Sequence, residues 1–169
     1  LRELKLVKCK IGDLEIFHIA KALDARYFMT PLVNLCLAEN EISVQGCSYL
    51  ADSLEWNIML EELDLSFNSV GAGGVKELTS KLCVNHSLKV LNLNSQIKKI
   101  GAEGATYLGK LLRQKDVNLR ILKCGANDIG FEGCRQLAGA LLVNTKLQEL
   151  DIGGINYITM AGAQQMGHS

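Results

Sequence analysis

The sequence predicts an α/β solenoid, in which about six strand–turn–helix units stack along residues 1–169 into one horseshoe-shaped segment. Two observations lead to this fold class. Apolar residues switch from alternation to helical spacing within single segments, and the same switch recurs at intervals of about 28 residues. Helices pack about 8–10 Å apart and strands about 4.8 Å apart. We therefore expect parallel strands on the concave side and helices on the convex side.

The segment LEELDLSFNSVGAGG, residues 60–74, shows one unit. Leu63 and Leu65 alternate with polar residues, which indicates a short strand. Residues 74–82 place apolar side chains at three- and four-residue steps, which indicates an amphipathic helix. Asn68 lies in the turn between them, where its amide can bind peptide groups that no regular ladder satisfies. We expect this asparagine to be structural and not catalytic.

The same unit recurs along the whole chain. The repeats begin at Leu1, Leu32, Leu60, Leu88, Leu119 and Leu147. Three of the five intervals are 28 residues and two are 31. The segment YFMTP accounts for one long interval, and the IKK loop with one residue near Asp116 accounts for the other. A unit of this size cannot bury its apolar face alone, so neighbours must stack. Since Leu1 is already in register and the last repeat stops after Met166, we expect a piece of a longer array.

This pattern resembles the ribonuclease-inhibitor-type leucine-rich repeats, whose unit is LxxLxLxx(N/C)x(I/L) followed by a glycine-led helix. The helical halves GCSYLADSL, GGVKELTSKL, GATYLGKLL and GCRQLAGALL match as well. Glu15 stands where glycine is expected, and Gln96 stands where asparagine is expected. The resemblance implies that one side chain per turn forms a ladder along the stack. Its members would be Asn40, Asn68, Asn127 and Asn156, with a weaker contribution from Cys9.

Glycines and cysteines occupy positions that the repeat sets. We expect Gly46, Gly74, Gly104 and Gly133 to lead the helices and to allow close packing of helix and strand. The six cysteines form no CxxC pair, and Cys47 and Cys134 share one repeat position. Buried free thiols are therefore favoured over a zinc site or a disulfide framework. Free thiols favour a reducing compartment, so we expect an intracellular, cytoplasmic protein.

The composition argues against several functions. Eighteen basic and eighteen acidic residues give no net charge, so neither nucleic acid nor a membrane surface is an expected partner. No apolar run is long enough to span a bilayer. The GAGG and GAEG segments lack the Lys-Ser/Thr ending of a phosphate-binding loop, and the three histidines lack partners for a triad. We expect no enzyme activity, no cofactor and no metal.

Two surfaces remain as candidates for binding a protein. The first is the concave face, where residues between the strand leucines point outward. Its candidate residues are Lys5, Asn34, Glu62, Asp64, Asn92, Lys123, Glu149 and Asp151. These positions carry no aromatic side chain, so a solvated face without a partner stays open as an alternative. The second surface is the strand-to-helix rim, with Phe67, Lys98, Lys99 and Tyr157 as candidates. A tolerated loop insertion is the alternative there.

The function that we predict is a non-catalytic protein-interaction module or scaffold. The resemblance implies protein binding in general and names no partner. One alternative is a regulator of a partner enzyme, as in Ran GTPase-activating proteins, which share the repeat type. That role needs an arginine or asparagine presented to the GTPase, and the concave positions hold no arginine. A passive spacer within a larger protein is the other alternative.

Overall fold

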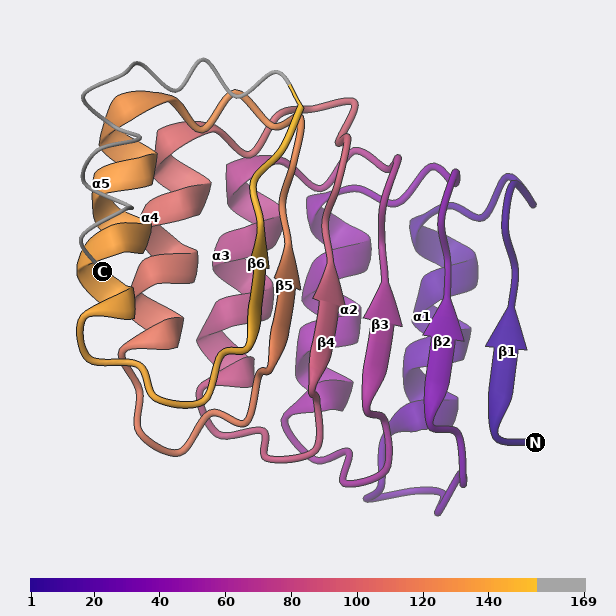
Figure 1. Ribbon diagram of the computed structural model, residues 1–169. Helices are drawn as coiled ribbons and strands as arrows, with labels where there is room; N and C mark the ends of the chain where they lie inside the picture. Colours follow the sequence, from indigo (N-terminus) through magenta and orange to yellow (C-terminus); the bar gives the residue numbers. More distant parts are fainter. Residues whose placement is uncertain (155–169) are drawn as a thin grey trace.

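Strands and helices alternate strictly in the computed structural model, which describes residues 1–154 (Figure 1). The strands, three residues each, are β1 (Glu3–Lys5), β2 (Asn34–Cys36), β3 (Glu62–Asp64), β4 (Val90–Asn92), β5 (Ile121–Lys123) and β6 (Glu149–Asp151). The helices are α1 (Asp13–Leu23), α2 (Val44–Leu54), α3 (Gly71–Leu82), α4 (Gly101–Leu112) and α5 (Gly130–Leu141). Within this part of the chain, no helix is long and apolar enough to cross a membrane.

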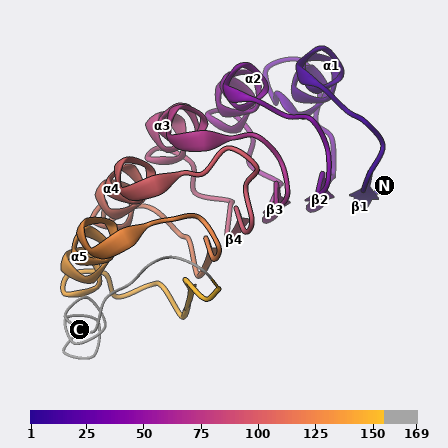
Figure 2. The same cartoon turned by 90° about the horizontal axis from the view of Figure 1, so that it is seen from above.

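The six strands form one parallel sheet in sequence order, β1 to β6. Each strand pairs in the same register as the one before. The central leucines therefore form one row: Leu4, Leu35, Leu63, Leu91, Leu122 and Leu150. Figure 2 shows the stack as an arc, with the strands on the inner side and the helices on the outer side. The predicted α/β solenoid is confirmed, and the curvature follows from the greater width of helices.

The core lies between the sheet and the helices. Each central repeat contributes two strand leucines, such as Leu63 and Leu65, and both of these are almost fully buried. The helices pack against them with one leucine per repeat in the same position. These residues are Leu50, Leu78, Leu108 and Leu137, and none is accessible to solvent. The core is one continuous apolar column through the stack, so each repeat depends on its neighbours for burial.

The Asn68 side chain satisfies the hydrogen-bonding groups of the turn between β3 and α3. Its buried Nδ2 donates to the carbonyl oxygens of Leu37, Leu65 and Ser66 at 2.9–3.1 Å. Its Oδ1 accepts the backbone N–H of Ile42 at 3.0 Å. One amide therefore ties its own turn to the preceding repeat, which confirms the expected structural role.

Asn40 and Asn127 repeat this arrangement in their own turns. Cys9 only partly replaces them, because its exposed thiol donates to Val7 O of the same turn at 3.3 Å. Asn156, the fourth expected asparagine, lies outside the described residues.

Gln96 keeps the ladder intact where the sequence departs from asparagine. Its Nε2 donates to Leu65 O at 2.7 Å, and its Oε1 accepts the backbone N–H of Val70 at 3.1 Å. Both contacts reach back to the preceding repeat. The side chain is fully buried in the turn that carries the IKK insertion. The extra methylene of glutamine therefore supplies the reach that this longer turn requires.

A second row of asparagine amides lies at the opposite edge, where helices return to strands, and those of Asn57 and Asn85 are buried. Asn57, Asn85 and Asn144 each donate to the end of the preceding helix, at Leu23 O, Leu54 O and Leu112 O. Each also accepts N–H groups at the start of its own strand segment. Sequence reasoning did not identify this row. Because the Asn85 amide is buried and bonded, its N-x-S tripeptide is unsuited to glycosylation.

The expected helix starts at Gly46, Gly74, Gly104 and Gly133 are wrong, since the helices begin two or three residues earlier. The glycines that turn the chain into α3, α4 and α5 are Gly71, Gly101 and Gly130, with φ between 59° and 63°. Gly74 instead serves packing between helices. A Cβ there would lie 2.7 Å from Val70 Cγ1 and 2.9 Å from Cys47 Sγ on α2.

The cysteine side chains that face the core pack there as small apolar residues. Cys47, Cys124 and Cys134 are all buried. Burial raises the pKa of Cys47 to about 12 and that of Cys124 to about 12 as well. Neither thiol forms the reactive thiolate near neutral pH. Their role is to fill space where the repeat needs a small apolar side chain.

The variant Leu63→Asp should unfold the central repeats, because it buries a charge without a partner between β3 and α3. Leu63→Ala should lower the free energy of unfolding by about 2–5 kcal/mol through the cavity that it leaves. Leu142→Ala is the control, since Leu142 is largely exposed. Chemical denaturation would measure all three. A cooperative Leu63→Asp transition near that of the wild type would contradict the proposed core.

Gln96→Asn should destabilise the fold, although it restores the usual residue of the repeat. The shorter side chain cannot hold both Leu65 O and Val70 N–H, and each buried group left unpaired costs about 1–3 kcal/mol. Urea denaturation would measure the loss, with the exposed Gln45→Asn as control. An equally stable Gln96→Asn variant would show that the reach of glutamine is not needed.

Candidate functional site

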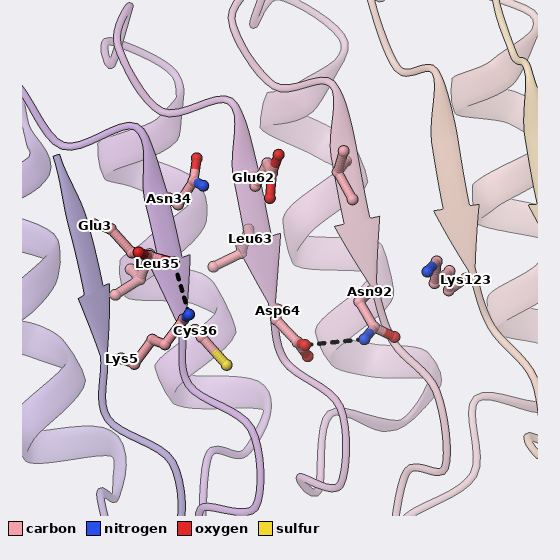
Figure 3. Close-up of a pocket in the computed structure, with 11 residues that line it drawn as sticks. Glu3, Lys5, Asn34, Leu35, Cys36, Glu62, Leu63, Asp64, Asn92 and Lys123 are labelled. Atoms are coloured by element: carbon pink, nitrogen blue, oxygen red, sulfur yellow. Dashed lines mark hydrogen bonds and ion pairs between the residues drawn. The ribbon is translucent and has the colours of Figure 1, made fainter.

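The concave face presents two rows of side chains set by the strand register (Figure 3). One row runs along the first strand positions: Glu3, Asn34, Glu62, Val90, Ile121 and Glu149. The other row runs along the third positions: Lys5, Cys36, Asp64, Asn92, Lys123 and Asp151. All eight predicted concave residues therefore share one surface. A groove of about 320 Å³ follows the sheet from β1 to β5.

The two lysines of this face already have partners within the sheet. Lys5 Nζ lies 2.8 Å from Glu3 Oε1, and this contact raises the pKa of Lys5. Lys123 Nζ lies 3.7 Å from Glu149 Oε1. All four side chains are substantially exposed, so these ion pairs contribute little to stability. They do reduce the positive charge that the face offers to a ligand.

Hydrogen bonds hold a second set of concave residues in place. Asp64 accepts from Ser66 N–H at 2.8 Å, from Ser66 Oγ at 2.6 Å and from Asn92 Nδ2 at 3.0 Å. Further along, Asn94 Nδ2 donates to Asp151 Oδ2 at 3.1 Å. Asn94 was not among the predicted site residues, although it continues the outward alternation just after β4. These contacts fix the orientation of Asp64 and Asp151.

The environment of Asp151 favours its charged form. The backbone N–H of Gly153 and the amide of Asn94 both donate to the carboxylate, and Lys123 lies nearby. Together they lower the pKa of Asp151, with the Gly153 hydrogen bond as the largest cause. Asp151 is therefore a fixed negative charge at neutral pH, largely satisfied by its own neighbours.

Glu62 and Asn34 are different, because their side chains form no hydrogen bond or ion pair within the described residues. No hydrogen bond or ion pair from residues 1–154 reaches the Glu62 carboxylate or the Asn34 amide. Both side chains lie at the groove between the paired lysines, as Figure 3 shows. Val90 follows Glu62 in the same row and is half-buried. The middle of the groove thus combines an available carboxylate, an available amide and an apolar neighbour.

The rim residues lie apart from the groove. Phe67 is 50% exposed and takes a left-handed backbone conformation, with φ of 55°. Lys99 Nζ donates to Ala126 O at 2.9 Å, and the backbone of Lys98 accepts Gly71 N–H at 3.1 Å. The rim lysines therefore also tie the IKK loop to its neighbours. Tyr157, the fourth rim candidate, lies outside the described residues.

Groups suited to chemistry do not converge on the concave face. Among the described residues, no three His, Cys, Asp or Glu side chains are placed to hold a metal ion. Arg26 is bound to Asp24, and Arg113 donates to Gln136 O. The strand positions of β1 to β6 carry no arginine. The geometry supports recognition of another molecule through shape, charge and hydrogen bonding.

Comparison with known proteins supports the same repeat type. A family model described as "Leucine Rich repeat" matches residues 57–78. Ribonuclease inhibitor of Mus musculus is 35% identical over 153 residues, which cover 90% of this chain and 32% of the inhibitor. NACHT, LRR and PYD domains-containing protein 13 of Homo sapiens is 32% identical, over 90% of this chain and 14% of that protein. The chain thus spans about a third or less of these two relatives.

Solved structures share the fold at lower sequence identity. The leiomodin-1 actin-binding site 2 structure has a TM-score of 0.67 at 17% identity, over 98% of this chain and 76% of that one. The tropomodulin C-terminal domain of Caenorhabditis elegans has a TM-score of 0.67 at 16% identity, over 92% and 89%. The repeated strands, the amide ladder and these likenesses agree. The chain is therefore built from leucine-rich repeats of the ribonuclease-inhibitor type.

Proposed function

We propose that the concave face binds a partner protein, and that Glu62 receives a lysine or arginine side chain of that partner. The observation that carries the proposal is the set of unengaged groups at the middle of the groove. The Glu62 carboxylate and the Asn34 amide form no hydrogen bond or ion pair within the described part of the chain. Lys5, Asp64, Lys123 and Asp151 each form at least one.

Charge complementarity favours a basic partner. The lysines flanking the groove are paired with Glu3 and Glu149, so their positive charge is largely offset. Glu62 and Asp64 lie side by side on β3 and leave the middle of the groove negative. A cation placed there would gain a charge-assisted hydrogen bond with Glu62. Half-buried Val90 and Ile121 would provide apolar contact in the same row.

The relatives support this class of function. Ribonuclease inhibitor is named for inhibiting a protein, a ribonuclease. The leiomodin-1 structure is titled as an actin-binding site. Those roles belong to those proteins, and we propose only the shared class, protein recognition, for this chain. A GTPase-activating role is the second candidate: the concave strand positions offer no arginine, although Asn34 offers an available amide. We propose a non-catalytic interaction module.

The variant Glu62→Lys should abolish capture of the partner, since it places a positive charge opposite the partner's cation. We expect affinity to fall at least about tenfold, and wild-type binding to weaken as salt increases. The measurement is capture from a lysate of cells that express the protein, identified by mass spectrometry and followed by titration with the purified partner.

Glu41→Lys is the matched control. It makes the same charge change on an exposed side chain that lies in the turn before α2, away from the groove. A partner lost with Glu62→Lys and kept with Glu41→Lys supports concave recognition. Equal capture by both variants would contradict it and move attention to another surface. Capture of nothing by the wild type would favour a passive spacer.

A further inference from the structure

The aromatic side chains of this protein gather away from the concave face. Five of the nine aromatic residues in the sequence belong to α1, α2 or the segments that follow these two helices. They are Phe17, Tyr27, Phe28, Tyr49 and Trp56. Tyr27 and Phe28 are 66% and 63% exposed, and Trp56 is 47% exposed. Aromatic residues and arginine are the side chains that most often anchor protein interfaces.

A groove of about 160 Å³ between α1 and α2 is lined by three of them, Phe17, Tyr27 and Tyr49. Phe17 and Tyr49 pack edge to face across it, with ring centroids 5.2 Å apart. Tyr27 lies at its end, where the Arg26 guanidinium is 5.7 Å from the Tyr27 ring and 5.2 Å from the Trp56 ring. Small-molecule sites usually measure about 300–1,000 Å³. This groove is smaller, and its size suits a single side chain of a peptide.

Internal bonds hold the aromatic end of the groove in one arrangement. Asp24 is buried and accepts Arg26 Nη2 at 2.6 Å, with further bonds from Arg26 Nε and the Arg26 backbone. The guanidinium beside Asp24 holds the pKa of that carboxyl below its ordinary value. The Asp24 charge is thereby offset, and Arg26 is oriented against Tyr27 and Trp56. A prearranged surface loses less side-chain entropy on binding.

Lys21 gives the groove its charge preference. Its Nζ lies 4.4 Å from the centroid of Phe17, and no carboxylate of residues 1–154 forms an ion pair with it. Asp52 on the opposite wall lies 4.0 Å from Lys81 Nζ, and Asp24 is bound to Arg26. Lys21 is thus a cation beside an apolar groove without an acidic partner in the described structure.

We propose that the α1–α2 groove is a second protein-docking site, independent of the concave face. Its occupant is a short peptide segment of a partner protein that carries an aliphatic or aromatic side chain next to an aspartate or glutamate. The apolar side chain enters between Phe17, Tyr49 and Tyr27. The carboxylate pairs with Lys21, where the nearby rings partly exclude water and strengthen the contact.

The test uses a random library of 12-residue peptides displayed on phage and selected on the purified wild-type chain. Enriched peptides are then synthesised without tryptophan and titrated. Trp56 is the only tryptophan in the chain, and its ring lies 5.2 Å from the Arg26 guanidinium that lines the groove, so its emission reports on that end of the groove. We expect enriched peptides to combine an apolar residue with a neighbouring acid and to shift the Trp56 emission.

Lys21→Glu and Tyr27→Ser should each weaken the selected peptides at least about tenfold, because each removes one of the two recognition elements. Both side chains are exposed, and thermal melts would check that the variants fold. Lys110→Glu is the matched control, since Lys110 lies 5.7 Å from the Tyr107 ring on α4, outside this groove. Glu62→Lys should leave peptide binding unchanged, which separates this site from the concave one.

Three outcomes would overturn the proposal. The selection enriches no peptide, or the enriched peptides are basic or lack an apolar residue. The enriched peptides bind Lys21→Glu and Tyr27→Ser as tightly as the wild type. The wild type self-associates in sedimentation and Tyr27→Ser prevents it, which would assign the groove to a second copy of this chain.

Discussion

Each repeat must change from strand to helix and back while its turns lie against another repeat, and buried amides make this possible. Peptide groups in such turns have no regular ladder and would otherwise be left unpaired. Asn68 bonds four of them, and Asn85 does the same at the other edge. Since these amides reach into the preceding repeat, they fix the spacing between units as well as the turns. With both edges fixed in this way, the strands pair in one register and the leucine column packs between them and the helices.

The fixed register determines what each surface can recognise. On the concave side it places equivalent strand residues next to one another, so Glu62 meets Asn34 on one side and Val90 on the other. On the convex side it brings Phe17 of α1 against Tyr49 of α2. The first surface is polar and extended, and the second is aromatic and confined to two repeats. One backbone repeat therefore supports two surfaces of different chemistry.

The fold could be predicted from the sequence because every unit repeats the same apolar spacing. The concave rows could be predicted for the same reason, since alternation in a strand determines which side chains point outward. Helix starts could not be placed correctly. Gly71 and Gly74 lie in one short run, and only the backbone shows which one turns the chain. The role of Gln96 was equally hidden, because it depends on the length of the turn.

The sequence also could not show which concave side chains already have hydrogen-bond partners and which are available to a ligand. Glu62 and Asp64 look equivalent in the pattern, yet Ser66 and Asn92 donate hydrogen bonds to Asp64 and not to Glu62. The α1–α2 groove combines residues from two repeats with Arg26, which lies in a segment that does not repeat. Periodicity gives no information about such a cluster. It becomes visible only when the helices are placed side by side.

The stacking order also has a consequence for how the protein responds to force. In residues 1–154, the neighbouring helices of each helix are those of adjacent repeats, and each strand likewise lies beside the strands of adjacent repeats. Stability in such a stack is close to a sum of repeat and neighbour terms. Every interface between repeats would therefore carry the whole tension along the solenoid, and the weakest interface would separate first. Stretching could separate the α1–α2 groove while Glu62 and its neighbours kept their arrangement, so the two surfaces would differ in mechanical sensitivity.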